Sequence, residues 1–326
     1  MHNRFIILFF ITAVTLFLFG CAEDEELPSL DIELSPILNT SENQRVFTTF
    51  DGKELGYVAY EDPNAKSEIA MVYLHGVESH AGWFKITSEL LQEHGYDVFC
   101  LDRRGSGINR ENRGFETGHV DSYETLFSDI QTFIKSLQPQ YKKIILVGLS
   151  WGGKLALSYV LTYPNDIDAL VLITPGISAK VDVTFFEKLQ ILVGTFIYPT
   201  LKITSPIEDE MFTDSPIFLE IIRNDPLKID VASARFYFQS VRLDRYVDRN
   251  IINNHLPTML ILAKHDPIID NAGVEQVVAK SSKAVTSYIY EDQKHSVQFD
   301  APERLVEDID AWLVSISPQK TALQIH

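Results

Sequence analysis

Ser150 is the residue whose surroundings most directly suggest chemistry. It is the centre of a Gly-Leu-Ser-Trp-Gly motif at residues 148–152, which joins an apolar, β-branched run at 144–147 to a run at 154–160 that is typical of the start of a helix. Glycines on both sides of a serine let a strand and a helix pass too close for side chains, and they force the serine onto a strained turn. A hydroxyl presented in this way is suited to nucleophilic attack on a carbonyl carbon. The pattern predicts a serine nucleophile at position 150.

The motif alone could also be a glycine-rich turn in any α/β protein, so its partners decide the interpretation. A serine hydroxyl is a poor nucleophile at neutral pH and needs a base, and histidine, with an ordinary pKa of about 6.5, suits that task. The base in turn needs a carboxylate to orient it. Asp266 follows a predicted strand at 258–263, and His295 follows another at 284–290. Because loops at the carboxyl ends of parallel strands meet at one edge of a sheet, we expect Ser150, Asp266 and His295 to converge.

Other acids and histidines remain open as alternatives. Asp270 and Asp292 could replace Asp266 as the orienting carboxylate. His265 is adjacent to the predicted acid and is expected to point elsewhere, and His80 comes too early in the chain to be the base.

The elements that must position these residues alternate between strand and helix. A hairpin is predicted at 45–60 around Asp51-Gly52, followed by strands at 69–74, 98–101, 144–147 and 169–173 with helices at 81–93 and 123–137 between them. The alternation stops between about 177 and 254, where two helical runs, at 186–197 and from 229 to about 247, indicate an inserted lid. Strands at 258–263 and 284–290 and helices at 274–279 and 302–313 complete the chain. This order predicts an α/β fold with a mostly parallel sheet, an antiparallel N-terminal hairpin and a helical lid after the sixth strand.

Several ordered segments carry a family resemblance. They are HGVESHAGWF, DRRGSGIN, GLSWGG, RNDPLKI, HDPII and His295, and across 47–312 the chain resembles the monoacylglycerol lipase and lysophospholipase branch of the α/β-hydrolases, whose profile overlaps that of serine aminopeptidases. The resemblance implies Ser150 as nucleophile with Asp266 and His295 as its partners. It also implies an oxyanion hole made by the N–H groups of Val77 and Trp151. Relatives often have His and Met on either side of the serine, so we expect Trp151 to narrow the acyl side of the pocket.

The implied function is hydrolysis of carboxylic esters, namely monoacylglycerols, lysophospholipids or similar small acyl esters, through an acyl-enzyme on Ser150 with no cofactor or metal. An aminopeptidase of the same fold is the nearest alternative, since acids in the predicted lid could bind a substrate amine. A catalytically silent hydrolase fold that serves as a binding module is a third possibility. The acids in question are Glu208, Asp209, Glu210 and Glu220.

The whole-chain numbers fit one large hydrolase domain. The chain has 326 residues, of which 45% are hydrophobic, so it can bury a substantial core. Its formal net charge of −17 argues against a nucleic-acid partner, because neutralising phosphates requires a basic face. The same charge argues against electrostatic attraction to anionic lipids, so membrane association would depend on an anchor or an apolar patch.

The N-terminus offers such an anchor. Arg4 precedes an apolar run at 5–19 that ends in Leu-Phe-Gly-Cys, which resembles the cleavage box of bacterial lipoproteins with Cys21 as the lipidated residue. We therefore expect a signal peptide at 1–21, an acidic tether at 22–41, a hydrolase domain at 42–316 and a tail at 317–326. An uncleaved signal anchor is the alternative, and either form exports the protein to the periplasmic side of a membrane or the cell surface. The other cysteine, Cys100, is predicted to be a buried core residue.

Overall fold

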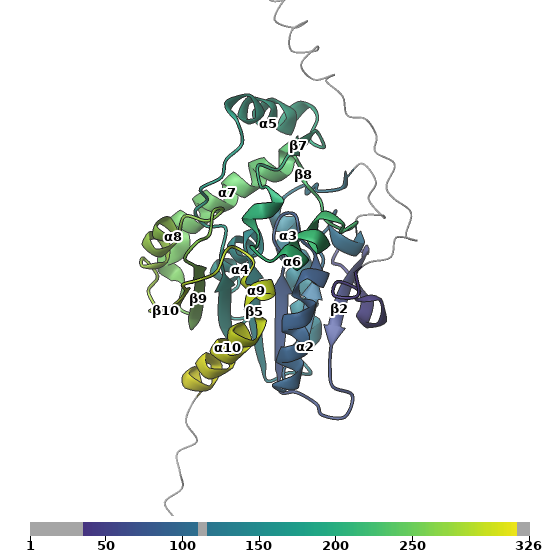
Figure 1. Ribbon diagram of the computed structural model, residues 1–326, viewed down its shortest axis with the longest axis vertical. Helices are drawn as coiled ribbons and strands as arrows, with labels where there is room; N and C mark the ends of the chain where they lie inside the picture. The colour runs from purple at the N-terminus through teal and green to yellow at the C-terminus, as the bar shows by residue number, and fades with distance from the viewer. Residues whose placement is uncertain (1–34, 110–115, 318–326) are drawn as a thin grey trace, which may run out of the picture.

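A mixed eight-stranded sheet forms the centre of the molecule (Figure 1). The computed structural model describes residues 35–109 and 116–317. The strand order is β1-β2-β4-β3-β5-β6-β9-β10, in which β2 is antiparallel to β1 and β4 and all other neighbours are parallel. This arrangement confirms the predicted mostly parallel sheet with an antiparallel N-terminal hairpin. The strands are β1 (Gln44–Thr48), β2 (Glu54–Tyr60), β3 (Ile69–Leu74), β4 (Asp97–Leu101), β5 (Lys143–Leu149), β6 (Ala169–Ile173), β9 (Thr258–Ala263) and β10 (Val285–Tyr290).

Helices cover both faces of the sheet, and alternate residues of each strand point into two separate hydrophobic cores. In β5, Ile144 and Leu146 pack into the core shared with α3 (Tyr123–Leu137), α4 (Trp151–Thr162) and α8 (Asn271–Val278). Ile145 and Val147 point the other way, into the core shared with α2 (Lys85–Glu93) and α10 (Pro302–Ile316). Burial on both faces is why these strands read as continuous apolar runs in the sequence.

The segment between β6 and β9 is an insertion above the sheet (Figure 1). It contains α5 (Phe185–Ile197), α6 (Pro216–Arg223), α7 (Ala234–Asn250) and the short strands β7 (Lys202–Thr204) and β8 (Val231–Ser233), which pair antiparallel. The prediction of a purely helical insertion, with a helix starting at 229, was therefore wrong in part. The α7 helix begins only at Ala234, where the Ser233 side chain accepts a hydrogen bond from the backbone N–H of Phe236 and caps the helix.

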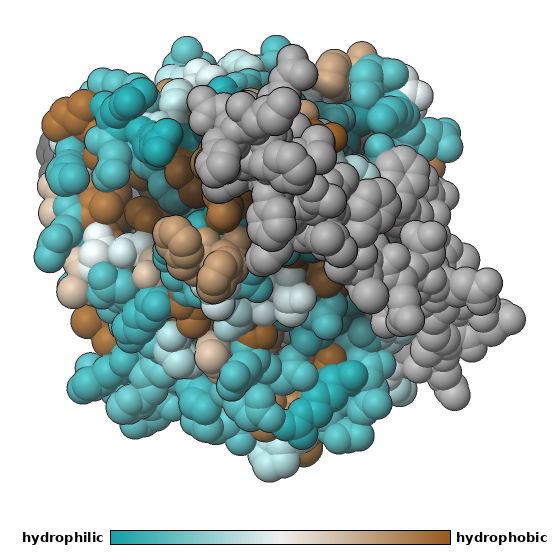
Figure 2. All heavy atoms as spheres, turned by 90° about the horizontal axis from the view of Figure 1, so that it is seen from above, coloured by the Kyte–Doolittle hydropathy of each residue, from teal (hydrophilic) through white to brown (hydrophobic). Residues whose placement is uncertain are grey.

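The α5 helix is the outermost part of the insertion, and its surface is unusually apolar. Phe185 is 77% exposed, Phe196 70% and Ile197 66%. Figure 2, which views the molecule from above, shows apolar groups gathered on this face beside a hollow. Within residues 35–109 and 116–317, no helix is both long enough and apolar enough to cross a bilayer.

Cys100 is fully buried in β4, as predicted, and its Sγ lies 3.3 Å from Ser88 Oγ. Burial raises the pKa of this thiol to about 12, so the residue is an unreactive part of the core. Cys21 and the rest of the expected signal peptide lie outside the described residues, as do most of the expected tether and tail.

The turn from β5 into α4 is strained and tightly packed. Ser150 has φ 53° and ψ −126°, a backbone conformation that residues other than glycine rarely adopt. A Cβ added to Gly152 would lie 2.1 Å from the carbonyl oxygen of Leu74 at the end of β3. The glycine at position 152 is thus required because two backbones touch there.

We expect Gly152→Ala to lower the free energy of unfolding by about 3 kcal/mol, because the extra methyl group must push β3 and α4 apart. Urea unfolding of the purified variant would measure this change. Gly52→Asn is a matched control: Gly52 lies in the β1–β2 turn with φ 78° and no atom within 4 Å of an added Cβ, and asparagine tolerates this conformation. Equal stability of the two variants would contradict the crowding argument.

Candidate active site

Asp266 and His295 form a buried hydrogen-bonded pair. Asp266 follows β9 and His295 follows β10, two adjacent parallel strands, and His295 Nδ1 lies 2.8 Å from Asp266 Oδ2. Both side chains are completely shielded from solvent. The other carboxylate oxygen of Asp266 accepts the backbone N–H groups of Ile268 (2.8 Å) and Ile269 (3.0 Å), which fixes the carboxylate plane. An ionised carboxylate in this position holds the proton of the imidazole on Nδ1 and leaves Nε2 as the basic nitrogen.

The alternative acids do not contact His295. Asp270 Oδ2 lies 3.4 Å from Ser178 Oγ, and Asp292 is on the loop after β10 without a hydrogen bond to the imidazole. The geometry therefore selects Asp266 among the three carboxylates that the sequence left open.

Ser150 is connected to His295 through the end of β6. The backbone N–H of Ser150 donates to the carbonyl oxygen of Ile173 (3.0 Å), and the next residue, Thr174, donates its hydroxyl to the carbonyl oxygen of His295 (3.1 Å). The hydroxyl of Ser150 and Nε2 of His295 make no hydrogen bond to each other. Within the described part of the chain, Nε2 is buried without any partner. Among the described residues, Nε2 is therefore not engaged by another hydrogen-bonding group.

The loop after β3 passes beside the serine. A Cβ added to Gly76 would lie 3.6 Å from Ser150 Oγ, and the next residue, Val77, lines the same cavity as Ser150 and Trp151. The backbone N–H groups of Val77 and Trp151 make no hydrogen bond to any residue that the structure describes. Trp151 is the first residue of α4, where backbone N–H groups lack intrahelical partners and carry partial positive charge. Among the described residues, both groups therefore remain available as hydrogen-bond donors.

The histidines of the 75–80 segment have structural environments. His75 Nε2 accepts the backbone N–H of Arg103 (3.2 Å), and burial, together with the nearby Arg103 charge, holds the pKa of His75 well below its usual value. His80 Nε2 lies 2.9 Å from the carboxylate of Asp225. Asp225 belongs to the insertion and also accepts the indole N–H of Trp83 (2.6 Å), so this pair fastens the insertion to the sheet domain. No pattern in the sequence indicates this contact, because the two partners are 145 residues apart.

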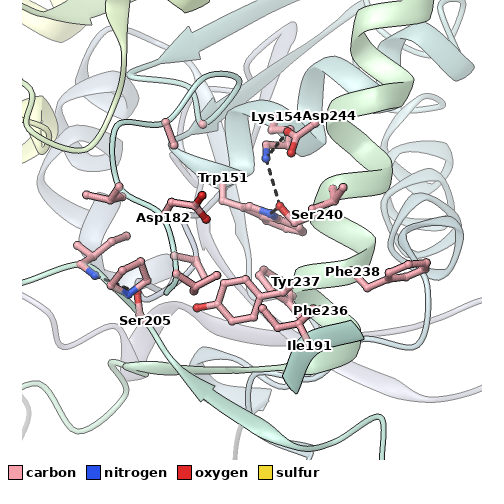
Figure 3. A pocket seen from close by; sticks show the side chains of 18 of the residues that line it. Trp151, Lys154, Asp182, Ile191, Ser205, Phe236, Tyr237, Phe238, Ser240 and Asp244 are labelled. Atoms are coloured by element: carbon pink, nitrogen blue, oxygen red, sulfur yellow. Dashed lines mark hydrogen bonds and ion pairs between the residues drawn. The ribbon is translucent and has the colours of Figure 1, made fainter. Parts of the chain in front are cut away.

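The cavity at Ser150 has a volume of about 670 Å³ and lies between α4 and the insertion (Figure 3). One wall is built by side chains of α4 and α7. The indole N–H of Trp151 and the ammonium of Lys154 both donate to Ser240 Oγ, at 3.0 and 3.1 Å, and Lys154 forms an ion pair with Asp244 at 2.5 Å. The other lining side chains are mainly apolar and include Val181, Ile191, Leu192, Ile207, Phe236, Tyr237, Val241, Ile268 and Ile269.

Trp151 itself forms part of this wall. Its ring packs against Phe236 with centroids 4.6 Å apart, and its hydrogen bond to Ser240 fixes the indole in place. A fixed indole next to Ser150 in the wall of the cavity supports the expectation that position 151 restricts the acyl side of the pocket.

The acids proposed for amine recognition lie elsewhere. None of Glu208, Asp209, Glu210 and Glu220 lines the cavity, and three of them have partners: Asp209 pairs with Lys228, Glu210 with Arg223, and Glu220 with Asn224. The carboxylates that do line it, Asp182 and Asp244, are paired with Lys188 and Lys154. Among the described residues, no three His, Cys, Asp or Glu side chains gather in a way that could hold a metal ion.

Comparison with known proteins places this geometry in a family. The family described as serine aminopeptidase, S33, matches residues 65–302, which include the serine, the acid and the histidine. The chain belongs to this family. Phospholipase YtpA of Bacillus subtilis is 25% identical over 73% of the chain and 91% of its own length, and human monoglyceride lipase is 24% identical over 81% of the chain and 88% of its own length.

The fold has close counterparts among solved structures. The crystal structure of the monoacylglycerol lipase of Paleococcus ferrophilus superposes with a TM-score of 0.73 at 23% identity, and the match covers 81% of this chain and all of that one. The prediction of an α/β-hydrolase fold that resembles monoacylglycerol lipases is therefore confirmed.

We expect Asp266→Asn to lower kcat about 10⁴-fold, because an amide no longer holds the proton of the imidazole on Nδ1. Steady-state hydrolysis of a soluble ester would measure this loss. Asp292→Asn is the control and should retain wild-type kcat. If Asp292→Asn were the more damaging change, the pairing between Asp266 and His295 would not be the catalytic one.

Proposed function

We propose that this protein is a serine hydrolase that cleaves carboxylic esters, namely monoacylglycerols, lysophospholipids or similar small acyl esters, through an acyl-enzyme on Ser150. The observation that carries the proposal is the buried pair of Asp266 and His295, which hydrogen bonds at Ile173 and Thr174 link to a strained serine on a largely apolar cavity. The names of the relatives, a phospholipase and a monoglyceride lipase, support the same substrate class.

In the proposed reaction, these residues carry out a two-step acyl transfer. Ser150 Oγ attacks the ester carbonyl carbon while His295 Nε2 takes the hydroxyl proton, and the N–H groups of Val77 and Trp151 stabilise the oxyanion of the tetrahedral intermediate. Collapse of the intermediate breaks the bond to the alcohol, which leaves with the proton from His295. A water molecule, deprotonated by the same nitrogen, then hydrolyses the acyl-enzyme and regenerates Ser150. Asp266 stabilises the imidazolium that forms in each step.

The lining of the cavity favours esters over aminoacyl amides. A substrate α-amine is a cation and needs an unpaired carboxylate at the site, because burying an unpaired charge is costly. The carboxylates that line the cavity in the described part of the chain, Asp182 and Asp244, already form ion pairs. The apolar remainder of the lining suits an acyl chain.

We expect a fluorophosphonate probe to label the wild-type enzyme at Ser150, with a phosphorus–oxygen bond formed as fluoride leaves, and Ser150→Ala to block the labelling. The labelled enzyme would be identified by mass spectrometry of the modified peptide. The wild type should hydrolyse p-nitrophenyl esters at least about 10²-fold faster than aminoacyl p-nitroanilides, because the carboxylates that line the cavity in the described residues, Asp182 and Asp244, are already paired with lysines. Faster cleavage of the anilides would identify an aminopeptidase, and absence of labelling would identify a silent fold.

We further propose that the enzyme works at a lipid surface to which it is anchored by lipid on Cys21 after export. The apolar face of α5 supports this proposal, since contiguous exposed apolar surface marks sites of protein or membrane contact. Ile191 and Leu192 of the same helix line the cavity, so the exposed face and the route to Ser150 share one element.

The predicted anchor puts a bilayer within reach. Cys21 and Ser35, the first described residue, are 35 − 21 = 14 residues apart, and a chain of that length spans at most about 50 Å when extended. A lipid on Cys21 would therefore keep the domain close to a membrane. The apolar face of α5 is the surface that we expect to contact the lipid.

We expect the double substitution Phe185→Ser with Ile197→Ser to lower the rate on monoacylglycerol in zwitterionic phospholipid vesicles about 10-fold or more, because each lost apolar side chain removes about 1.5–3 kcal/mol of burial in lipid. Activity on a soluble short-chain ester should stay at the wild-type level. Val314→Ser, on α10 at the opposite end of the molecule, is the control with similar exposure, 67%. Loss of activity on both substrates, or on neither, would contradict an interfacial role for α5.

A further inference from the structure

Arg103 is a buried cation that the catalytic scheme above does not use. It follows Asp102 at the end of β4 and is only 9% exposed. Burial lowers the pKa of its guanidinium to about 9, which leaves it charged at neutral pH. A buried charge of this kind needs compensating partners, and here these are the neighbouring Asp102 carboxylate and the backbone carbonyl groups of Gly76 and Val77.

Two nitrogens of the guanidinium donate hydrogen bonds to the loop after β3. Arg103 Nη1 donates to the carbonyl oxygen of Gly76 at 2.5 Å, and Nη2 donates to the carbonyl oxygen of Val77. The imidazole Nδ1 of His75 also lies 2.8 Å from the Gly76 oxygen. The planar fork of arginine can reach two successive carbonyl groups at once, whereas the single ammonium of lysine cannot hold both in the same geometry.

The first of these carbonyls belongs to the peptide group that carries the proposed oxyanion donor. In a trans peptide the C=O and the N–H point in opposite directions, so a donor that fixes the Gly76 carbonyl also fixes the direction of the Val77 N–H. A positive charge at the carbonyl end polarises the peptide group and makes the N–H a stronger donor. Arg103 thus lies at the carbonyl end of a peptide dipole whose N–H end belongs to Val77, a residue that lines the cavity of Ser150.

The guanidinium also packs over the ring of Trp151, which carries the second proposed donor. The guanidinium carbon lies 5.3 Å from the ring centroid of Trp151 and 5.3 Å from that of Phe236, a distance at which a cation and an aromatic face attract each other. One side chain therefore contacts both residues whose N–H groups face the developing charge.

We propose that Arg103 is the positioning residue of the oxyanion hole: it aligns the Gly76–Val77 peptide group and seats Trp151, so that both N–H groups meet the tetrahedral intermediate. This inference rests on the proposed function, because it concerns the same acyl transfer. Arg103 does not touch the substrate, and its effect should appear in the transition state and not in substrate binding.

The test compares Arg103→Lys and Arg103→Met with Arg104→Lys. Arg104 is the neighbouring arginine, is equally buried, and pairs with Asp51 and Asp129 instead of the loop. Each protein is titrated with the fluorophosphonate so that rates refer to the reactive fraction, and thermal unfolding reports any loss of fold. Two inhibitors are then compared on each protein. A long-chain trifluoromethyl ketone forms a tetrahedral adduct with Ser150, whereas the corresponding methyl ketone binds without forming that adduct.

Both Arg103 variants should lose about 10- to 100-fold in kcat with little change in KM, less than the 10²–10³ lost when a donor is removed outright. The inhibition constant of the trifluoromethyl ketone should rise by the same factor, while that of the methyl ketone stays constant. Arg104→Lys should retain wild-type values.

Unchanged kcat in the Arg103 variants, or equal weakening of both ketones, would overturn the inference and leave the ester hydrolase intact. A wild-type enzyme that neither hydrolyses esters nor reacts with the fluorophosphonate would overturn the proposed function and this inference together.

Discussion

The contact between the end of β3 and the first turn of α4 is the constraint on which the site depends. Gly152 brings the α4 backbone against the carbonyl oxygen of Leu74, and a Cβ added to Gly148 would lie 2.5 Å from the carbonyl oxygen of Gly152. The end of β3 carries the loop with Gly76 and Val77, and the start of α4 carries Ser150 and Trp151. Close packing at this one point therefore brings the proposed nucleophile and the residues of both proposed N–H donors close together. A side chain at either glycine would separate them.

The proposed base, His295, is positioned by different strands. Strands β6, β9 and β10 are neighbours in the sheet and run parallel, so their carboxyl ends lie side by side although the residues there are far apart in the chain. Thr174, Asp266 and His295 follow these three strands in turn. The Thr174 hydroxyl holds the His295 backbone, and Asp266 holds the ring, so main chain and side chain of the histidine are fixed from two adjacent strand ends.

Much of this could be predicted from the sequence because the signals are local. The glycines around Ser150 and the apolar runs of β3, β5, β6 and β9 each report their own conformation, and the order of serine, acid and histidine follows from strand order. The sequence favoured Asp266 but left Asp270 and Asp292 open, because the backbone turn at Ile268 and Ile269, which orients the Asp266 carboxylate toward the ring, has no signature in residue types.

What the sequence did not reveal depends on distant partners. The strands β7 and β8 are three residues each and exist because they pair with one another, so neither has a pattern long enough to detect. The pairing of His80 with Asp225 likewise joins residues far apart in the chain. The hydrogen bonds from Arg103 to two backbone carbonyl groups could not be predicted either, because residue types do not identify backbone acceptors.

The wall made by Trp151, Lys154, Ser240 and Asp244 has a consequence for how such an enzyme can diversify. These four side chains form one bonded unit across α4 and α7, and the Ser240 hydroxyl is shared by an indole and an ammonium. Replacing Trp151 alone to admit a bulkier acyl chain leaves Ser240 with one donor fewer, and replacing Asp244 alone leaves the largely buried Lys154 ammonium without its counter-charge. Substitutions at these positions are consequently non-additive, and divergent lineages should exchange the aromatic residue, the hydroxyl and the ion pair as a set.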